Sequence, residues 1–155
     1  MSDKPSIYLA GPMSGLTWRQ ALAWRREVEA ELSKDWRLIN PVRAQTPEDQ
    51  RDEIIEATTQ LSTKKVDIEV TATAVTAQDE FFIDQSDWIL AYFLGATKIS
   101  IGTVWELGYG WGTGKKIFSV LEPGSIHDHA FVRRRSHVFT NNLDEAIQFF
   151  KAIAL

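Results

Sequence analysis

The sequence predicts one α/β domain built on a doubly wound, mainly parallel sheet of five strands, with helices on both faces. Short apolar runs alternate along the chain with longer segments of helical periodicity, a pattern typical of parallel sheets covered by helices. The 155 residues contain no internal repeat and no domain-length linker, and this length suffices for one compact core. The expected architecture, over residues 1–155, is therefore of the Rossmann or flavodoxin type.

The first part of the predicted domain starts with a buried strand at residues 6–10, and a glycine-containing turn at residues 11–15 follows it. Thr17 or a neighbour caps the next helix, whose apolar residues recur near helical spacing. These apolar residues are Trp18, Ala21, Leu22, Val28 and Leu32. The solvated face of this helix is expected to carry Arg19, Arg25, Arg26 and Glu29. A short second strand occupies residues 36–39.

The middle of the chain, residues 43–65, is polar, and Pro47-Glu48-Asp49 has the composition of a helix start. Residues 66–70 alternate between apolar and acidic side chains, which predicts a strand or hairpin arm. The Thr/Ala-rich run at 71–77 gives no clear assignment. A helix is expected from residue 77 to residue 86.

The second half of the predicted domain contributes three strands, at residues 88–93, 116–120 and 137–139. The helix between the first two opens within residues 98–110 and ends near Gly112 or Gly114. Asn141 or Asn142 caps a final amphipathic helix at residues 143–154.

Composition excludes several classes of protein. The net charge of −4 argues against a general nucleic-acid binder, and no apolar run approaches the roughly 20 residues of a membrane span. Cysteine is absent, which excludes disulfides, thiolate catalysis and cysteine-based zinc sites. The amino terminus runs straight into a strand without a visible signal peptide, so we expect a cytoplasmic protein.

The start of the helix within residues 98–110 is the strongest candidate for a ligand site. Ser100, Gly102 and Thr103 would present donors there to an anionic or hydroxyl-rich ligand. Glu106 lies one turn further in, where an ionised carboxylate could act as a nucleophile. Thr103 and Glu106 also fit a capping box, in which the glutamate only bonds back to the helix start, and this stretch alone leaves both readings open.

Two other motifs fail on inspection. The glycine-rich run at 108–115 lacks both the dinucleotide and the phosphate-loop spacing, and it lies at a helix end. We interpret it as close helix–sheet packing followed by a glycine stop. His127, Asp128 and His129 are adjacent and cannot readily close a metal shell alone. We therefore expect neither a cofactor nor a bound metal.

Three features together are more specific than any one of them. Ligands of parallel sheets bind where strands end at their carboxyl edge, and Tyr8-Leu9-Ala10-Gly11-Pro12 closes the first strand there. The acidic residues Asp79, Asp84 and Asp87 precede the third strand. The segment Ser-x-Gly-Thr-x-x-Glu-Leu-Gly, residues 100–108, follows that strand. This combination resembles the nucleoside 2-deoxyribosyltransferase family, including its relatives that hydrolyse nucleoside 5′-monophosphates, from about residue 7 to residue 120.

The resemblance implies roles for three catalytic residues. Glu106 matches the family's nucleophile, which attacks the anomeric carbon, and Tyr8 matches the tyrosine that orients it. Asp79 stands eight residues before Asp87 and matches the aspartate that serves the base. The expected substrate-binding residues are Gly11, Pro12, Asp84, Asp87, Ser100, Gly102 and Thr103.

The resemblance also implies a nucleoside or nucleotide and a free nucleobase as ligands, and a homo-oligomer, dimeric or higher, with shared active sites. Asp128 or His129 would then reach a neighbouring subunit's site. The leading expectation is base exchange on 2′-deoxynucleosides through a glycosyl–glutamate intermediate. Ser100 stands where the transferases carry an aspartate, however, and a serine at this position resembles the monophosphate hydrolases. Hydrolysis of nucleoside 5′-monophosphates is therefore one alternative, and a non-catalytic nucleotide-binding module is another.

Overall fold

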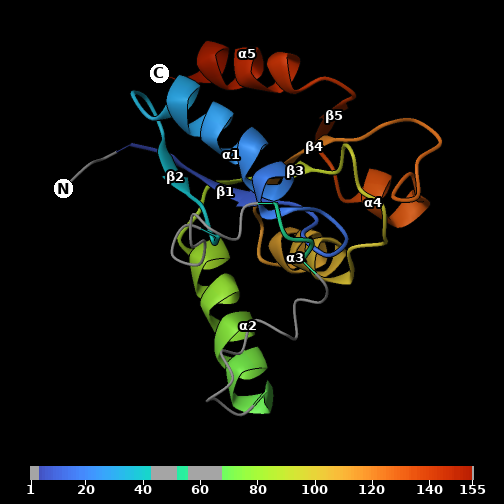
Figure 1. Cartoon of the computed structure of the whole chain (residues 1–155). Helices are drawn as coiled ribbons and strands as arrows, with labels where there is room; N and C mark the ends of the chain where they lie inside the picture. Colours follow the sequence, from blue (N-terminus) through green and yellow to red (C-terminus); the bar gives the residue numbers. More distant parts are fainter. Residues whose placement is uncertain (1–3, 43–51, 56–67, 155) are drawn as a thin grey trace.

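A computed structural model of the chain describes residues 4–42, 52–55 and 68–154 (Figure 1). Its sheet has the strand order β2-β1-β3-β4-β5, and every neighbouring pair is parallel. The strands are β1 (Ser6–Ala10), β2 (Arg37–Ile39), β3 (Trp88–Tyr92), β4 (Lys116–Val120) and β5 (Val138–Thr140). The parallel five-stranded α/β architecture expected from the sequence is confirmed.

Helices cover both faces of this sheet (Figure 1). On one face, α1 (Trp18–Leu32) and α5 (Leu143–Ile153) bury an apolar cluster that includes Val28, Leu90 and Phe150. On the other face lie α2 (Ile68–Asp84), α3 (Ile101–Gly112) and the short α4 (Ala130–Arg134). Tyr8 and Ile89 belong to the second cluster, on the α3 side. Successive strand residues thus serve opposite cores, as the pleat requires.

The structure corrects the prediction for the segment before β3. Ile68–Val70, expected in a strand or hairpin arm, belong to α2, and so do the Thr/Ala-rich residues 71–77. Threonine and valine have only slightly weaker helix propensity than most other residues, so a run that contains them can continue a helix, and the alternation at 66–70 is too short to specify a strand. The helix start expected at 47–49 lies outside the described residues.

Other boundaries agree with the sequence to within two residues. Thr17 caps α1 in a reciprocal capping box with Gln20, and Asn142 caps α5. The α4 helix was not expected; His129 caps it. No helix among the described residues is long and apolar enough to cross a membrane.

Two glycines permit close packing near the strands. A Cβ atom at Gly110 would lie 2.2 Å from Ile89 Cδ1, which supports the interpretation of the glycine-rich run as helix–sheet packing. A Cβ atom at Gly11 would lie 2.9 Å from the carbonyl oxygen of Tyr92 and 2.9 Å from Trp24 Cζ2. The chain leaving β1 can therefore pass this close to the end of β3 only as glycine.

Candidate active site

The centre of the candidate site is a hydrogen bond between Tyr8 and Glu106. Tyr8 is fully buried in β1, and its hydroxyl group donates to Glu106 Oε1 at 2.7 Å. Glu106 lies in the second turn of α3 and is partly buried. The two residues are distant in sequence but meet because β1 and α3 pack against each other on one face of the sheet.

The cap of α3 decides between the two readings of Glu106. Ser100 is the N-cap, and its Oγ accepts a hydrogen bond from the amide of Thr103. Thr103 therefore occupies the position where a capping-box glutamate would stand, and Glu106 lies one turn beyond it. The capping-box alternative is wrong, and the Glu106 carboxylate is directed at Tyr8 instead.

Asp79 approaches the same tyrosine from α2. The Asp79 side chain is partly buried and burial raises its pKa to about 6, while a side-chain hydrogen bond with Tyr8 acts in the opposite direction. The phenol pKa of Tyr8 is itself raised, first by burial and then by the charges of Glu106 and Asp79. Tyr8 is therefore a neutral donor placed between two carboxyl groups.

Burial raises the pKa of both carboxyl groups near Tyr8. Burial raises the pKa of Glu106 to about 7, and Asp79 adds to the rise, while the Tyr8 hydrogen bond and the charge of Arg25 lower it. Burial therefore favours the protonated form of both carboxyl groups, whereas a nucleophilic Glu106 must be ionised. Because the charge of Asp79 raises the pKa of Glu106, the two carboxyl groups titrate as a coupled pair.

Arg25 is the functional neighbour that sequence reasoning misplaced. It was expected on the solvated face of α1, but it is only 1% exposed. Its Nη2 donates to the carbonyl oxygen of Gly11 at 3.2 Å, its Nη1 donates to Ala21, and its guanidinium lies 4.5 Å from the ring centre of Trp24. Burial lowers the pKa of Arg25 to about 10, so it is charged at neutral pH. Its spacing of three residues from both Leu22 and Val28, on the apolar stripe, was the signal for burial.

The start of α3 offers fewer free donors than the sequence suggested. The amide of Ser100 donates to His127 Nε2 at 2.8 Å, and Ser100 Oγ lies 2.8 Å from Thr103 Oγ1. Thr103 is buried. The amides of Ile101 and Gly102 have no partner among the residues that the structure describes. These two exposed amides are the donors that remain for a ligand.

Two expected binding residues lie at the other edge of the sheet. Asp87 accepts hydrogen bonds from the amide and hydroxyl of Ser6, at the beginning of β1. Both carboxylate oxygens of Asp84 accept from Tyr109 Oη at 3.1 Å, and the backbone carbonyl of Asp84 accepts from Lys115, which precedes β4. The structure therefore does not bring Asp84 and Asp87 to Glu106, because both residues precede β3 whereas the site lies at the opposite ends of the strands.

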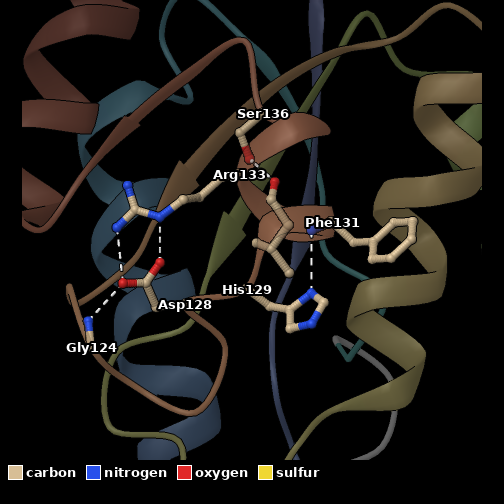
Figure 2. A network of polar contacts seen from close by, with 7 residues as sticks. Gly124, Asp128, His129, Phe131, Arg133 and Ser136 are labelled. Atoms are coloured by element: carbon tan, nitrogen blue, oxygen red, sulfur yellow. Dashed lines mark hydrogen bonds and ion pairs between the residues drawn. The ribbon is translucent and has the colours of Figure 1, made fainter.

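The loop after β4 holds the residues expected to reach a neighbouring site (Figure 2). Asp128 accepts from Arg133 Nη2 at 2.8 Å and from the amide of Gly124 at 2.7 Å, and these contacts lower its pKa to about 2. His129 is exposed, and its Nδ1 accepts from the amide of Phe131 at 3.2 Å. Within one subunit both side chains therefore stabilise the loop and α4.

A separate pocket of about 320 Å³ opens on the α1 side of the sheet. Pro12, Trp24, Glu27 and Tyr92 are among its lining residues, whereas Tyr8, Asp79 and Glu106 are not. Pro12, an expected binding residue, therefore borders this pocket, while Gly11 contacts Arg25. Among the described residues, no group of three or more potential ligands is placed to hold a metal ion.

Comparison with known proteins shows which proteins this chain resembles in sequence and in fold. The sequence profile of the nucleoside 2-deoxyribosyltransferase family matches residues 7–132. A 2-deoxyribosyltransferase from Bacillus psychrosaccharolyticus is 20% identical, covering 92% of this chain and 90% of its own, with a TM-score of 0.66. A CMP N-glycosidase from Clostridium botulinum is 19% identical over 95% of this chain and 98% of its own, with a TM-score of 0.55. No curated protein matches the sequence.

Proposed function

Since the chain belongs to the nucleoside 2-deoxyribosyltransferase family, we propose that it cleaves the N-glycosidic bond of 2′-deoxynucleosides and transfers the sugar to another base. The observation that carries this proposal is the 2.7 Å hydrogen bond from buried Tyr8 to Glu106. It aims a carboxylate at the edge where ligands of parallel sheets bind. A non-catalytic module would have no need of this buried pair, whose charge is costly to desolvate.

The proposed reaction consists of two displacements at the anomeric carbon. Ionised Glu106 attacks C1′, the C1′–N bond breaks, and its electron pair leaves with the base, which takes a proton from Asp79. The second base then attacks C1′ from the face that the first base left, expels Glu106, and returns a proton to Asp79. Two inversions give net retention, as in glycosidases with a carboxylate nucleophile.

Only one protonation state of the two carboxyl groups is productive in this scheme. A proton must reside on Asp79 while Glu106 is ionised, although burial favours protonation of both groups. Tyr8 donates to Glu106 and Arg25 contributes positive charge, and both effects favour the ionised form of Glu106. These two neighbours therefore act toward the productive state and oppose the effect of burial.

Chromatography of reaction mixtures tests the proposed activity. Deoxyadenosine incubated with an excess of a different free base should yield the new deoxynucleoside, and the Glu106→Gln variant should yield none. Release of deoxyribose without a new nucleoside would mean hydrolysis instead of transfer. No turnover of any deoxynucleoside or nucleotide by the folded protein would contradict the proposal.

A second candidate function is hydrolysis of nucleoside 5′-monophosphates, favoured by the start of α3. Ser100 stands there in place of a carboxylate, and the amides of Ile101 and Gly102, which have no partner among the described residues, would donate hydrogen bonds to a phosphate group. If this candidate is right, kcat/KM for dAMP should exceed that for deoxyadenosine at least tenfold, as expected for a charge-assisted contact. The Ser100→Asp variant should invert this preference, because its carboxylate would repel phosphate. Equal values for the two substrates would exclude the candidate.

The proposed enzyme is a homo-oligomer whose subunits meet near the site. Large apolar side chains are exposed around the start of α3 and the loop after β4: Ile99, Ile101, Trp105, Ile126 and Phe131. Exposed apolar patches of this kind mark interaction surfaces. A symmetric contact there would carry Asp128 and His129 of one subunit toward its neighbour.

A further inference from the structure

All three histidines of this chain accept a hydrogen bond from a backbone amide. The acceptor–donor pairs are His127 Nε2 with Ser100, His129 Nδ1 with Phe131, and His137 Nδ1 with Ile117, at 2.8, 3.2 and 3.0 Å. A ring nitrogen that accepts a hydrogen bond carries no proton. Protonation of that nitrogen would replace the acceptor with a donor and break the bond.

Of the three, His127 alone is buried, with 2% of its surface exposed. Its ring packs on Phe93 with 4.7 Å between the ring centres, and its Nδ1 is buried without a partner among the described residues. The titratable residues near it in sequence have other partners or face solvent: Asp128 pairs with Arg133, and the side chains of Lys98, close to Ser100, and His129 are exposed. Burial accordingly lowers the pKa of His127.

The bond from His127 fixes the first turn of α3. His127 Nε2 accepts a hydrogen bond from the amide of Ser100. The hydroxyl group of Ser100 in turn caps the helix and contacts Thr103. The contact joins the loop after β4 to the cap of α3. The amides of Ile101 and Gly102 follow directly, and their direction depends on how Ser100 is held.

We propose that neutral His127 is a positioning residue that holds Ser100 so that the amides at the start of α3 face the ligand. Loss of the bond, by substitution or by protonation, releases this turn and weakens substrate binding more than it slows the chemical step. Because burial disfavours the charged imidazole, the bond persists above the lowered pKa of His127 and is lost as the pH falls through it. The substrate-binding part of this inference rests on the proposed function.

The test compares two matched variants. His127→Phe keeps the ring volume and the packing on Phe93 but cannot accept the Ser100 amide. His137→Phe removes the same kind of bond from Ile117, at the beginning of β4 and away from the site. At pH 7.5, His127→Phe should raise KM about three- to tenfold, as expected for loss of one hydrogen bond, and change kcat less than twofold. His137→Phe should leave both constants unchanged. His127→Asn, whose amide oxygen can accept, should recover part of the loss.

A second readout does not depend on turnover. In wild-type protein, the amide NMR signal of Ser100 should shift with pH in parallel with the ring signals of His127, and His127→Phe should abolish that titration. An unchanged KM in folded His127→Phe, or a Ser100 amide signal that does not shift when His127 is protonated, would overturn the proposal. If His127→Phe fails to fold, the wild-type titration, with KM measured at the same pH values, decides the question. If the protein turns over no nucleoside, the proposed function fails, while the Ser100 titration still tests the hydrogen bond.

Discussion

The phenol of Tyr8 and the carboxylate of Glu106 form a buried hydrogen bond of 2.7 Å that joins the first strand to the second turn of α3. The donor must remain protonated for this bond to exist, and burial raises the phenol pKa, which ensures it. A neutral donor lowers the proton affinity of the carboxylate without adding a charge. The same contact therefore orients Glu106 and helps to keep it ionised.

Removing that donor should impair catalysis mainly at neutral and low pH. In Tyr8→Phe the pKa of Glu106 should rise above about 7, because burial persists while the hydrogen bond that opposes it is lost. The acid limb of the kcat/KM profile should move to higher pH, and kcat should fall about tenfold or more as the nucleophile loses its orientation. A profile that superimposes on that of the wild type would show that Tyr8 has no such role.

Ionised Glu106 should lower the free energy of unfolding at alkaline pH. Its pKa is raised in the folded state, so the folded protein binds the proton more tightly than the unfolded chain. The associated stability is present below the unfolded pKa and is lost as the pH rises through about 7. Glu106→Gln should therefore be more stable than wild type at pH 8, by on the order of 2 kcal/mol, and much less so at pH 4.

Urea unfolding at the two pH values measures this difference. Glu122→Gln, at an exposed position in the loop after β4, is the matched control and should show no such pH-dependent gain. Equal effects of the two substitutions would mean that Glu106 is not desolvated in the folded protein.

Arg25→Met should raise the pKa of the Glu106 carboxyl group. The buried guanidinium lowers the pKa of Glu106, so its removal should move the acid limb of kcat/KM to higher pH. Arg25→Lys keeps the charge and should shift it less. Arg26→Met, one residue along α1 and exposed, is the control. Identical pH profiles for Arg25→Met and Arg26→Met would exclude an electrostatic role of Arg25.

Gly11→Ala should destabilise the protein. The added Cβ would meet the backbone of Tyr92, which cannot move aside as a flexible side chain could, and the side chain of Trp24. The expected loss in the free energy of unfolding is about 1–3 kcal/mol. Gly108→Ala, on the open surface of α3, should instead be neutral or stabilise by up to about 1 kcal/mol. Thermal unfolding of both variants measures this difference in stability. Equal stabilities would show that Gly11, after β1, does not lie this close to the end of β3.

The proposed oligomer should depend on the exposed apolar side chains near α3. Light scattering at micromolar concentration should give a mass of at least two subunits, and Phe131→Glu should lower it because Phe131 is 69% exposed. Ile54→Glu, an equally drastic change at an exposed position outside this surface, should not. A fully active wild-type monomer would remove the idea of shared sites.

The pairing of Tyr8 with Glu106 was implied by the family resemblance of the two motifs that contain these residues. The topology of the sheet agrees with it, because both motifs lie near the carboxyl ends of parallel strands. Arg25 was harder to place, because a charged residue on an apolar stripe is normally counted as solvated. His127 was noted only as part of a possible metal cluster. Its contact with Ser100 joins two loops whose meeting no local pattern encodes.

Asp84 and Asp87 show a different limit. The family resemblance implied that both bind substrate, but residues before a strand lie at its amino end, and the two carboxylates accept hydrogen bonds there from Tyr109 and Ser6. The extent of α2 was missed for a third reason. The alternation at residues 66–70 has the period of a strand, but its described part, residues 68–70, is the first turn of α2, and five residues are too few to distinguish the two periods.

The central claim is that Glu106 becomes covalently attached to the sugar, and trapping that intermediate tests it most directly. A 2′-fluoro-2′-deoxynucleoside should slow both displacements, because fluorine destabilises the oxocarbenium-like transition state. After reaction and acid quenching, mass spectrometry should show one added fluorodeoxyribosyl group on the peptide that contains Glu106, and none in Glu106→Gln. Turnover of the natural substrate without any trapped adduct, or an adduct on a different residue, would contradict the account.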